Sequence, residues 1–416
     1  MSITRRAFLR NSALAVVGTA AVPSFLARSA WGADQLGVRN KRLVVIFQRG
    51  AADGLNIVVP HAEPQYYSMR PSINIPRKAV LDLDGFFGLH PSLAPFQPLW
   101  QQRQLAIVHA AGSPDPNRSH FDAQDFMESG TPGIKSTEDG WLNRSLHRLQ
   151  QPAQGQRSPF QAIAMGPSIP RILSGIEPAI AMNNINDFSV GGRNPKPSPV
   201  ATAFESMYDH SSDTVLHGTG EETFDAVKML KAADPSKYMP APGADYPKGR
   251  FGDSMRQLAQ LIKANLGVQV AFADIGGWDH HVNEGATEGQ IANVLRDFSQ
   301  SLAAFWTDLG DLGEDTVVVT MSEFGRTARE NGNRGTDHGH ANVMFVLGGP
   351  VKGGKVYGRW PGLDQSQLYE GRDLALTTDF RQVLGEGVAR HLGNKNLNEV
   401  FPGYENQPGK FLRLLG

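Results

Sequence analysis

The chain has 416 residues, 19% of them charged and 40% hydrophobic, with a formal net charge of −1. This balance does not indicate a nucleic-acid partner, because such a partner requires a surplus of Lys and Arg on one surface. The sequence has no cysteine, which excludes disulfides, thiolate catalysis and thiolate-bound zinc. Any metal must therefore be held by oxygen and nitrogen ligands.

The first 32 residues resemble a twin-arginine (Tat) export signal. Arg5 and Arg6 are followed by an Ala-Phe-Leu sequence, an apolar stretch over residues 13–26 and a small-residue cleavage site ending at Ala33. This pattern predicts export to the periplasm by the Tat translocase, with an uncleaved N-terminal anchor as the alternative. Because the Tat route carries folded proteins, it also suits a protein that is loaded with a metal before export.

Residues 41–48 form the first expected strand, because apolar and β-branched residues run through them almost without a break. The small residues that follow allow the backbone to turn tightly, which places Asp53 beside the carboxyl edge of the sheet. Open α/β sheets bind their ligands at this edge. Asp53 is therefore a candidate metal ligand, although an Asp-Gly pair is also a common turn sequence.

The next expected strand covers residues 105–110 and leads through a loop into a helix that includes residues 125–128. Ser119 lies near the start of this helix, where free N–H groups and the helix dipole favour an anion and can lower the pKa of a hydroxyl. Ser119 is therefore a candidate nucleophile, with a plain N-cap role as the alternative. Arg118 beside it could hold the anionic group of a substrate.

Residues 130–250 are rich in Pro, Gly, Ser and Asn, which indicates a loop-rich insertion or cap. Within them, residues 160–164 favour a strand and residues 222–232 a helix. An amphipathic helix follows over residues 254–266, where the apolar side chains gather on one face. No chemistry can be assigned to the insertion from its sequence.

Residues 268–273 form an expected strand that ends in an Asp-Ile-Gly-Gly-Trp-Asp-His-His sequence. The two glycines allow the backbone to come close to a bound group. Asp279 and His281 offer a carboxylate and an imidazole just past the strand, which predicts a metal cluster. A pair of surface histidines is the alternative.

A long helix over residues 288–310 precedes two further strands, over residues 316–320 and 342–347. The loop between these strands carries carboxylates and imidazoles, which suit a divalent metal of the zinc or manganese type. A solvated acidic loop with surface histidines is the alternative. The candidates in this loop are Glu323, Asp337, His338 and His340 as metal ligands and Arg326 as an anion-binding residue.

The alternation of strands and helices over residues 33–416 predicts a single three-layer αβα sandwich with a largely parallel central sheet. Polar residues past the strand ends would then meet in one crevice and hold two divalent ions, of zinc, manganese or calcium. Two such ions can bind the attacking and leaving oxygens of a phosphoryl or sulfuryl displacement. A serine hydrolase is not indicated, because the sequence has no G-x-S-x-G motif.

The chain resembles the bacterial domain-of-unknown-function family 1501 in a series of ordered motifs, among them RGAADGLNIVVP, NRSHFDAQDFMESG, GGWDHHVNE, MSEFGRT and GTDHGHANVMFVLGG. That family looks like a branch of the alkaline phosphatase/sulfatase superfamily. The resemblance implies an alkaline phosphatase-like fold, with Asp53 as the ligand after the first strand, Ser119 as the nucleophile, and Asp279 with His281 as the middle ligand pair.

One motif departs from the superfamily pattern. In MSEFG, Glu323 falls where the superfamily has an Asp, and Phe324 falls where it has a His. The resemblance therefore implies a second metal only if His338 or His340 replaces the missing imidazole.

Three functions remain open at this point. The first is a periplasmic metal-dependent hydrolase of phosphate or sulfate esters that acts on a small anionic ester. The second is a non-catalytic protein that binds a metal or an anion and acts in the cell envelope with a co-exported protein partner. The third is a metal-assisted transferase that acts on an envelope component.

Overall fold

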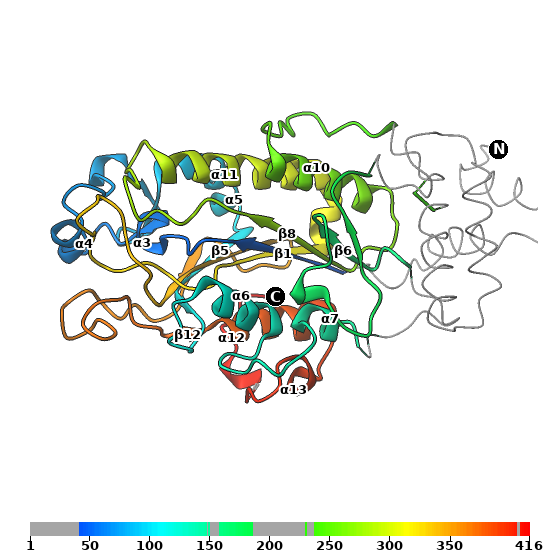
Figure 1. Ribbon diagram of the computed structural model, residues 1–416. Helices are drawn as coiled ribbons and strands as arrows, with labels where there is room; N and C mark the ends of the chain where they lie inside the picture. Colours follow the sequence, from blue (N-terminus) through cyan, green and yellow to red (C-terminus); the bar gives the residue numbers. More distant parts are fainter. Residues whose placement is uncertain (1–40, 148, 150–157, 186–228, 231–236, 406–407) are drawn as a thin grey trace, which may run out of the picture.

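A computed structural model describes residues 41–147, 149, 158–185, 229–230, 237–405 and 408–416 (Figure 1). The Tat-like segment and most of the helix expected over residues 222–232 lie outside the described residues. Among the helices that the structure describes, none combines the length and the apolar character needed to cross a bilayer.

The centre of the molecule is a nine-stranded mixed sheet. All described strand pairings in it are parallel except those of β10, which runs antiparallel to both of its neighbours. The strands in sheet order are β11 (Lys355–Tyr357), β5 (Leu105–Gly112), β10 (Asn342–Gly348), β9 (Thr316–Met321), β1 (Arg42–Gln48), β8 (Val270–Ile275), β6 (Ala162–Met165) and β7 (Ile180–Met182), and β12 (Thr378–Asp379) also pairs with β5.

The two faces of the sheet are buried because each strand sends alternate apolar side chains to opposite sides. In β1, Val44 and Ile46 belong to one hydrophobic cluster, and Leu43, Val45 and Phe47 belong to the other. The first cluster is covered by α5 (Gln97–Gln101), α10 (Arg250–Lys263), α11 (Gln290–Leu309) and the 3₁₀ segment η2 (Pro91–Phe96).

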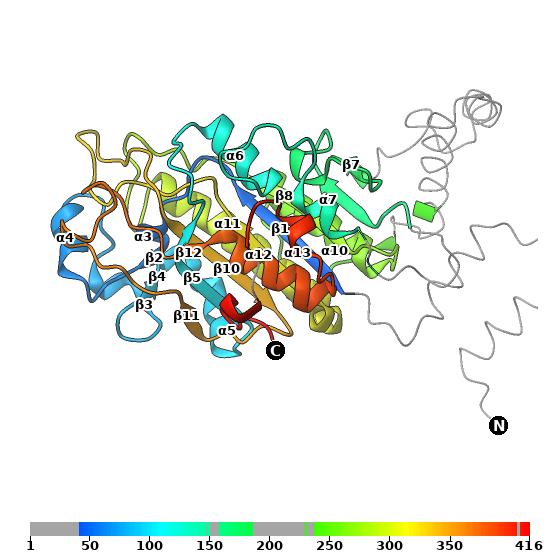
Figure 2. The same cartoon turned by 90° about the horizontal axis from the view of Figure 1, so that it is seen from below.

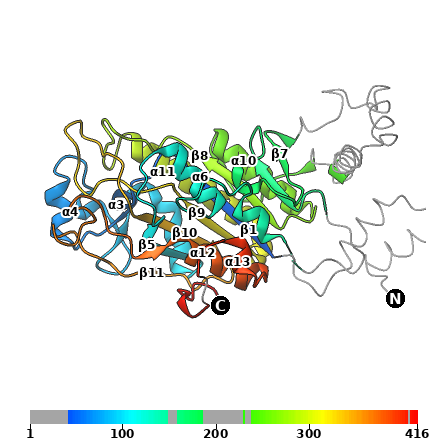
Figure 3. The same ribbon diagram turned by 60° about the horizontal axis from the view of Figure 1, so that its bottom comes forward.

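The opposite face is covered by a second layer of helices, which Figure 3 brings forward. This layer comprises α6 (His120–Ser129), α7 (Trp141–Ser145), α12 (Phe380–Glu386), the π-helical segment η7 (Gly387–Leu392) and α13 (Leu397–Val400). The predicted three-layer αβα sandwich with a largely parallel sheet is therefore confirmed.

A smaller antiparallel sheet lies at one end of the main sheet (Figure 2). It contains β2 (Val58–Val59), β4 (Gly88–Leu89) and β3 (Leu81–Asp82), and the short helices α3 (Gly54–Ile57) and α4 (Pro64–Met69) lie beside it.

Part of the region predicted as an insertion belongs to the body of the fold. Strands β6 and β7 extend the central sheet next to β8, and α7 packs on one of its faces. The described residues of the region 130–250 therefore include strands that complete one side of the sheet.

The direction of β10 decides where the site forms. Because β10 is antiparallel to β9, the residues before β10 and those after β9 lie at the same edge of the sheet. The carboxyl ends of β1, β5 and β8 reach this edge as well. All loops predicted to carry chemistry therefore leave the sheet on one side.

Candidate metal centre

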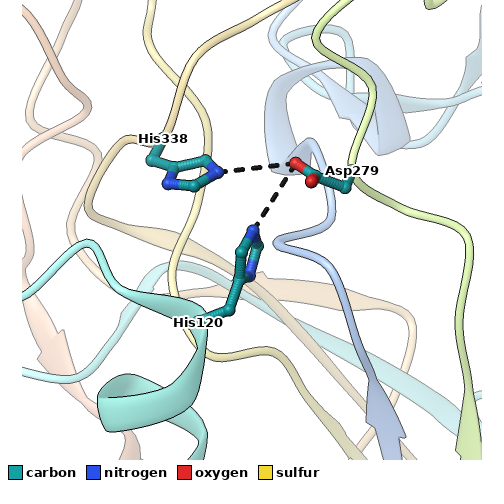
Figure 4. Close-up of side chains that lie close together, drawn as sticks. All are labelled: His120, Asp279 and His338. Atoms are coloured by element: carbon teal, nitrogen blue, oxygen red, sulfur yellow. Dashed lines mark ion pairs between the residues drawn. The ribbon is translucent and has the colours of Figure 1, made fainter.

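Three loops at this edge bring His120, Asp279 and His338 together (Figure 4). His120 is the first residue of α6, Asp279 follows β8, and His338 precedes β10. One ligand atom from each residue lies within 4.8 Å of the other two. The Nε2 atoms of His120 and His338 lie 3.5 and 3.4 Å from Oδ1 of Asp279.

Gly50 allows the loop after β1 to approach this group. Its φ of +116° is a conformation that residues with a side chain rarely adopt. A Cβ at this position would lie 2.9 Å from the backbone nitrogen of Asp279. The glycine therefore brings the loop after β1 and the loop after β8 into contact.

Two of the imidazoles have a fixed orientation, because their Nδ1 atoms face groups that can only accept a hydrogen bond. His120 Nδ1 lies 2.8 Å from Oε1 of Glu323, and His338 Nδ1 lies 2.8 Å from the carbonyl oxygen of Arg118. We assign the ring hydrogen to Nδ1 in both cases. In the neutral imidazole, Nε2 then carries a lone pair that faces Asp279.

His281 adds a third imidazole with the same orientation. Its Nδ1 lies 3.2 Å from Oδ1 of Asp337, while its Nε2 lies 3.1 Å from Oδ1 of Asp279 and 3.0 Å from Nε2 of His338. His281 therefore completes the group on its exposed side.

With the ring hydrogens assigned to Nδ1, the histidine Nε2 atoms are hydrogen-bond acceptors that face the carboxylate of Asp279. The Nε2 atom of His120 is buried and has no hydrogen-bond partner, which is costly unless a cation binds there. A tetrahedral zinc ion with bonds of about 2.0–2.1 Å places its ligand atoms about 3.3–3.4 Å apart, close to the separations of 3.4 and 3.5 Å from Asp279. Nitrogen and carboxylate donors at these distances fit a divalent ion of the zinc type.

Arg326 holds Asp279 in place. Its Nη2 donates to Oδ1 of Asp279 at 2.6 Å, and its other N–H groups donate to the carbonyl oxygens of Ala51, Gly50 and Thr336. Although burial alone would raise the pKa of Asp279, the hydrogen bond and the charge of Arg326 lower it. The Arg326 side chain is fully buried, so it positions a ligand and is not free to bind a substrate anion as the sequence analysis expected.

Glu323 lies behind His120 and is not itself within the group of ligand atoms. It accepts hydrogen bonds from His120, from Gln124 at 2.9 Å and from the backbone N–H of Gly50 at 2.8 Å. Burial would raise the pKa of Glu323, but these hydrogen bonds lower it. In return, the hydrogen bond to Glu323 raises the pKa of His120. A carboxylate that orients a histidine in this way is common behind metal ligands.

Asp53 is not brought into the group. Its two carboxylate oxygens accept hydrogen bonds from the buried guanidinium of Arg70, one of them at 3.0 Å. Asn56 accepts from the same guanidinium at 2.9 Å and donates to Glu284 at 3.2 Å. Asp53 therefore belongs to a separate buried network, although it lies in the loop where the sequence predicted it.

Arg118 and Ser119 lie beside the group. The guanidinium of Arg118 is paired with Glu370 at 2.7 Å and with Asp373 at 2.6 Å, and its carbonyl oxygen orients His338. Ser119 is the exposed N-cap of α6, and its hydroxyl makes no capping hydrogen bond.

His340 also lies apart, since its ring stacks on Tyr369 with 4.3 Å between the ring centres. Of the seven ligands expected from the sequence, the structure brings Asp279, His281 and His338 together. Glu323 and Asp337 instead orient histidines of the group.

His120 was missed because Ser119 beside it matched the expected nucleophile. The signal that could have found His120 is its place: an imidazole at the first position of a helix that follows a strand at the ligand-binding edge.

The fold and this site define a class: a three-layer α/β protein with a candidate metal centre at the carboxyl edge of its sheet. The family model described as "Protein of unknown function (DUF1501)" matches residues 40–401. The chain therefore belongs to the DUF1501 family, as the motifs predicted. A comparison with curated proteins found no match.

Solved structures show only distant likeness to the chain. The C-terminal periplasmic domain of EcEptC from Escherichia coli, in complex with Zn, is 10% identical, with 76% of this chain and 74% of that chain covered and a TM-score of 0.35. The PsFucS1 sulfatase from Pseudoalteromonas sp. is 12% identical, with 93% and 75% covered and a TM-score of 0.41. The phosphonate monoester hydrolase of Agrobacterium radiobacter is 11% identical, with 89% and 78% covered and a TM-score of 0.33. Likeness of this degree carries no conclusion about activity.

Proposed function

We propose that this protein is a metal-dependent hydrolase of phosphate or sulfate esters. One observation carries the proposal: the Nε2 atoms of three imidazoles, from His120, His281 and His338, lie 3.1–3.5 Å from Oδ1 of Asp279. The ester class comes from the ordered motifs, which resemble those of the alkaline phosphatase/sulfatase superfamily.

Each residue has a defined task in this proposal. His120, Asp279 and His338 hold the ion, Glu323 and the carbonyl of Arg118 orient the two imidazoles, and Arg326 keeps Asp279 ionised. When bound, a divalent ion polarises an ester oxygen and lowers the pKa of a hydroxyl or a water.

Ser119 is the candidate nucleophile, because its hydroxyl is exposed at the start of α6, next to His120. Ser119→Ala should abolish turnover while the bound metal stays. If activity survives in this variant, a water must be the attacking group.

The test is a panel of aryl phosphates and aryl sulfates, assayed with protein loaded with zinc, manganese or calcium. We expect turnover with at least one metal and its loss in Asp279→Ala. No turnover of any ester by metal-loaded protein would contradict the proposal, and turnover only with an added acceptor alcohol would make the protein a transferase.

A second candidate function has one observation in its favour. If His281 binds the same ion as His120, Asp279 and His338, four protein ligands close a tetrahedral site, as in structural zinc centres. The protein would then bind metal without catalysis and act in the envelope with a co-exported partner. Tight stoichiometric metal, no turnover and a co-purifying protein would support this function.

We further propose a periplasmic location after Tat export, on the basis of the paired Arg5 and Arg6. Replacement of both by lysine should leave the precursor in the cytoplasm on cell fractionation. Normal export of that variant would refute the Tat route.

A further inference from the structure

Phe121 is exposed to an unusual degree for a large aromatic residue. Its relative exposure is 89%, although it directly follows His120. Buried residues of α6, among them Ala123, Phe126 and Met127, face the core. Single exposed hydrophobic residues are common on protein surfaces, so what distinguishes Phe121 is its position next to His120.

Phe121 lies on the side of α6 away from the apolar side chains that pack in the core. At about 100° per residue, Ala123, Phe126 and Met127 cluster on the side of the helix opposite Phe121. That outer side of a surface helix is normally polar. Phe121 therefore breaks the amphipathic pattern next to a candidate metal ligand.

A second exposed apolar residue follows another residue of the centre. Val282 is 51% exposed and directly follows His281. The side chains of Asp279 and His281 are 48% and 39% exposed, so the candidate metal centre is open to solvent. Large hydrophobic side chains are exposed at six places in the described part of the chain, and two of them adjoin the centre.

We infer that the centre takes an amphiphilic ester, whose anionic head binds at His120, Asp279 and His338 and whose apolar alcohol part packs against Phe121 and Val282. This inference rests on the proposed function for the nature of the head group. A long alkyl chain would bind more tightly than a short one, because its contact with Phe121 and Val282 removes apolar surface of both the ligand and the protein from water.

The first test compares ethyl phosphate with octyl phosphate as substrates of the zinc-loaded protein, because the two alcohols are similarly basic leaving groups. Phe121→Ser should lower kcat/KM for octyl phosphate about tenfold and leave that for ethyl phosphate unchanged. Phe121→Leu should keep most of the preference. Ile176→Ser is the matched control, because Ile176 is 84% exposed and is not among the residues described for the centre.

The second test uses binding alone, so that failure of the proposed hydrolysis can be told apart from failure of this inference. Titration of the zinc-loaded protein with octylphosphonate and methylphosphonate should give about tenfold tighter binding of the octyl compound, and Phe121→Ser should remove the difference. This result without turnover of any ester would refute the hydrolase and leave the amphiphilic ligand standing.

Three results would overturn the inference. They are equal affinity for the two phosphonates, no binding of either, and an unchanged preference in Phe121→Ser. Binding of the protein to phosphatidylcholine vesicles that Phe121→Ser abolishes, without any preference among the phosphonates, would make Phe121 a membrane contact instead.

Discussion

Two groups of charged and polar side chains lie at the same edge of the central sheet, and they differ in how their acceptors are satisfied. Around Asp53, both carboxylate oxygens accept from Arg70, and Glu284 accepts from Asn56 and from Thr336. Around Asp279, the Nε2 atoms of three histidines lie 3.1–3.5 Å from Oδ1 of the carboxylate. Each acceptor named in the first group has a donor within the protein, whereas the second group holds a buried imidazole nitrogen without one, Nε2 of His120.

The difference gives a criterion for assigning a carboxylate to a metal site, namely whether the acceptors around it already have donors within the protein. The positive charge that neutralises Asp53 is the guanidinium of Arg70, which is fully buried. In the histidine group, Arg326 is paired with Asp279, and only protons or a bound cation can occupy the space between the histidine Nε2 atoms. Burial lowers the pKa of His338, so at neutral pH its Nε2 is available as a ligand, whereas the hydrogen bond to Glu323 raises the pKa of His120. We therefore expect one divalent ion per chain among the described residues, where the sequence predicted two.

The largest expected effect is the loss of that ion. His338→Gln should reduce bound zinc from about one equivalent to almost none, because the loss of a group that only orients a ligand already lowers affinity about 10–100-fold. His340→Gln is the matched control, since His340 stacks on Tyr369 and should leave the zinc content unchanged. Elemental analysis of both purified variants checks the prediction. Two equivalents of zinc in the unaltered protein, or loss of zinc in His340→Gln, would contradict a single ion that is bound without His340.

The second prediction concerns stability at the other group. Asp53→Asn leaves the charge of Arg70 buried and only partly paired, so the free energy of unfolding should fall by about 3–5 kcal/mol. The remaining folded protein should still bind one zinc ion. Urea denaturation measures the free energy of unfolding, and metal analysis of the same sample measures the zinc content.

Asp122→Asn is the control for that substitution, because Asp122 forms a surface pair with Lys135 and should be almost neutral. If Asp53→Asn instead releases zinc while stability is unchanged, Asp53 is a ligand, and the two groups are not separate.

Most of the fold could be predicted because its strands are local features of the sequence. The apolar runs over residues 41–48 and 316–320 correspond closely to β1 and β9. The pairing of strands is not local. The antiparallel direction of β10 and the place of β6 and β7 in the main sheet depend on contacts between distant residues.

The candidate site was predictable to the same extent. Residue type and position after a strand located Asp279, His281 and His338. They did not locate Arg70, which lies 17 residues after Asp53 in a segment without a motif and removes Asp53 from the ligand set. They also did not separate the residues that would bind the metal from those that orient its ligands. Glu323 and Asp279 are both carboxylates that follow strands, but Glu323 contacts Nδ1 of His120 whereas Asp279 lies in the group of candidate ligands.

A third prediction concerns a residue that orients a ligand. Glu323→Gln keeps the size of the side chain but replaces the charged acceptor of the His120 N–H by a neutral amide. Zinc affinity should fall about 10–100-fold with the stoichiometry unchanged. Calorimetric titration separates these two quantities. An unchanged affinity would mean that Glu323 has no part in holding His120.

The smallest expected effect is a pH dependence of stability that comes from Glu284, in the group around Asp53. Burial, together with the charge of Asp53, raises the pKa of Glu284 well above 4.5, whereas Asp53 keeps a lowered pKa because Arg70 outweighs its burial. Above pH 4.5, Glu284 therefore keeps its proton to a higher pH in the folded chain than in the unfolded chain. Since the folded state then holds the extra proton, the contribution of Glu284 to stability decreases as pH rises above 4.5.

Glu284→Gln supplies the same neutral shape without a proton to lose. In metal-free protein, the free energy of unfolding of the natural chain should fall relative to Glu284→Gln by at most about 1.4 kcal/mol per pH unit between pH 5 and pH 7. Both proteins contain the same histidines and Asp53, so the contributions of these residues to the pH dependence cancel in the difference between the two free energies of unfolding. Parallel stability curves in this range would mean that Glu284 is ionised in the folded chain. The network around Asp53 would then hold two buried carboxylates for the one guanidinium of Arg70, and the contrast with the metal centre would disappear.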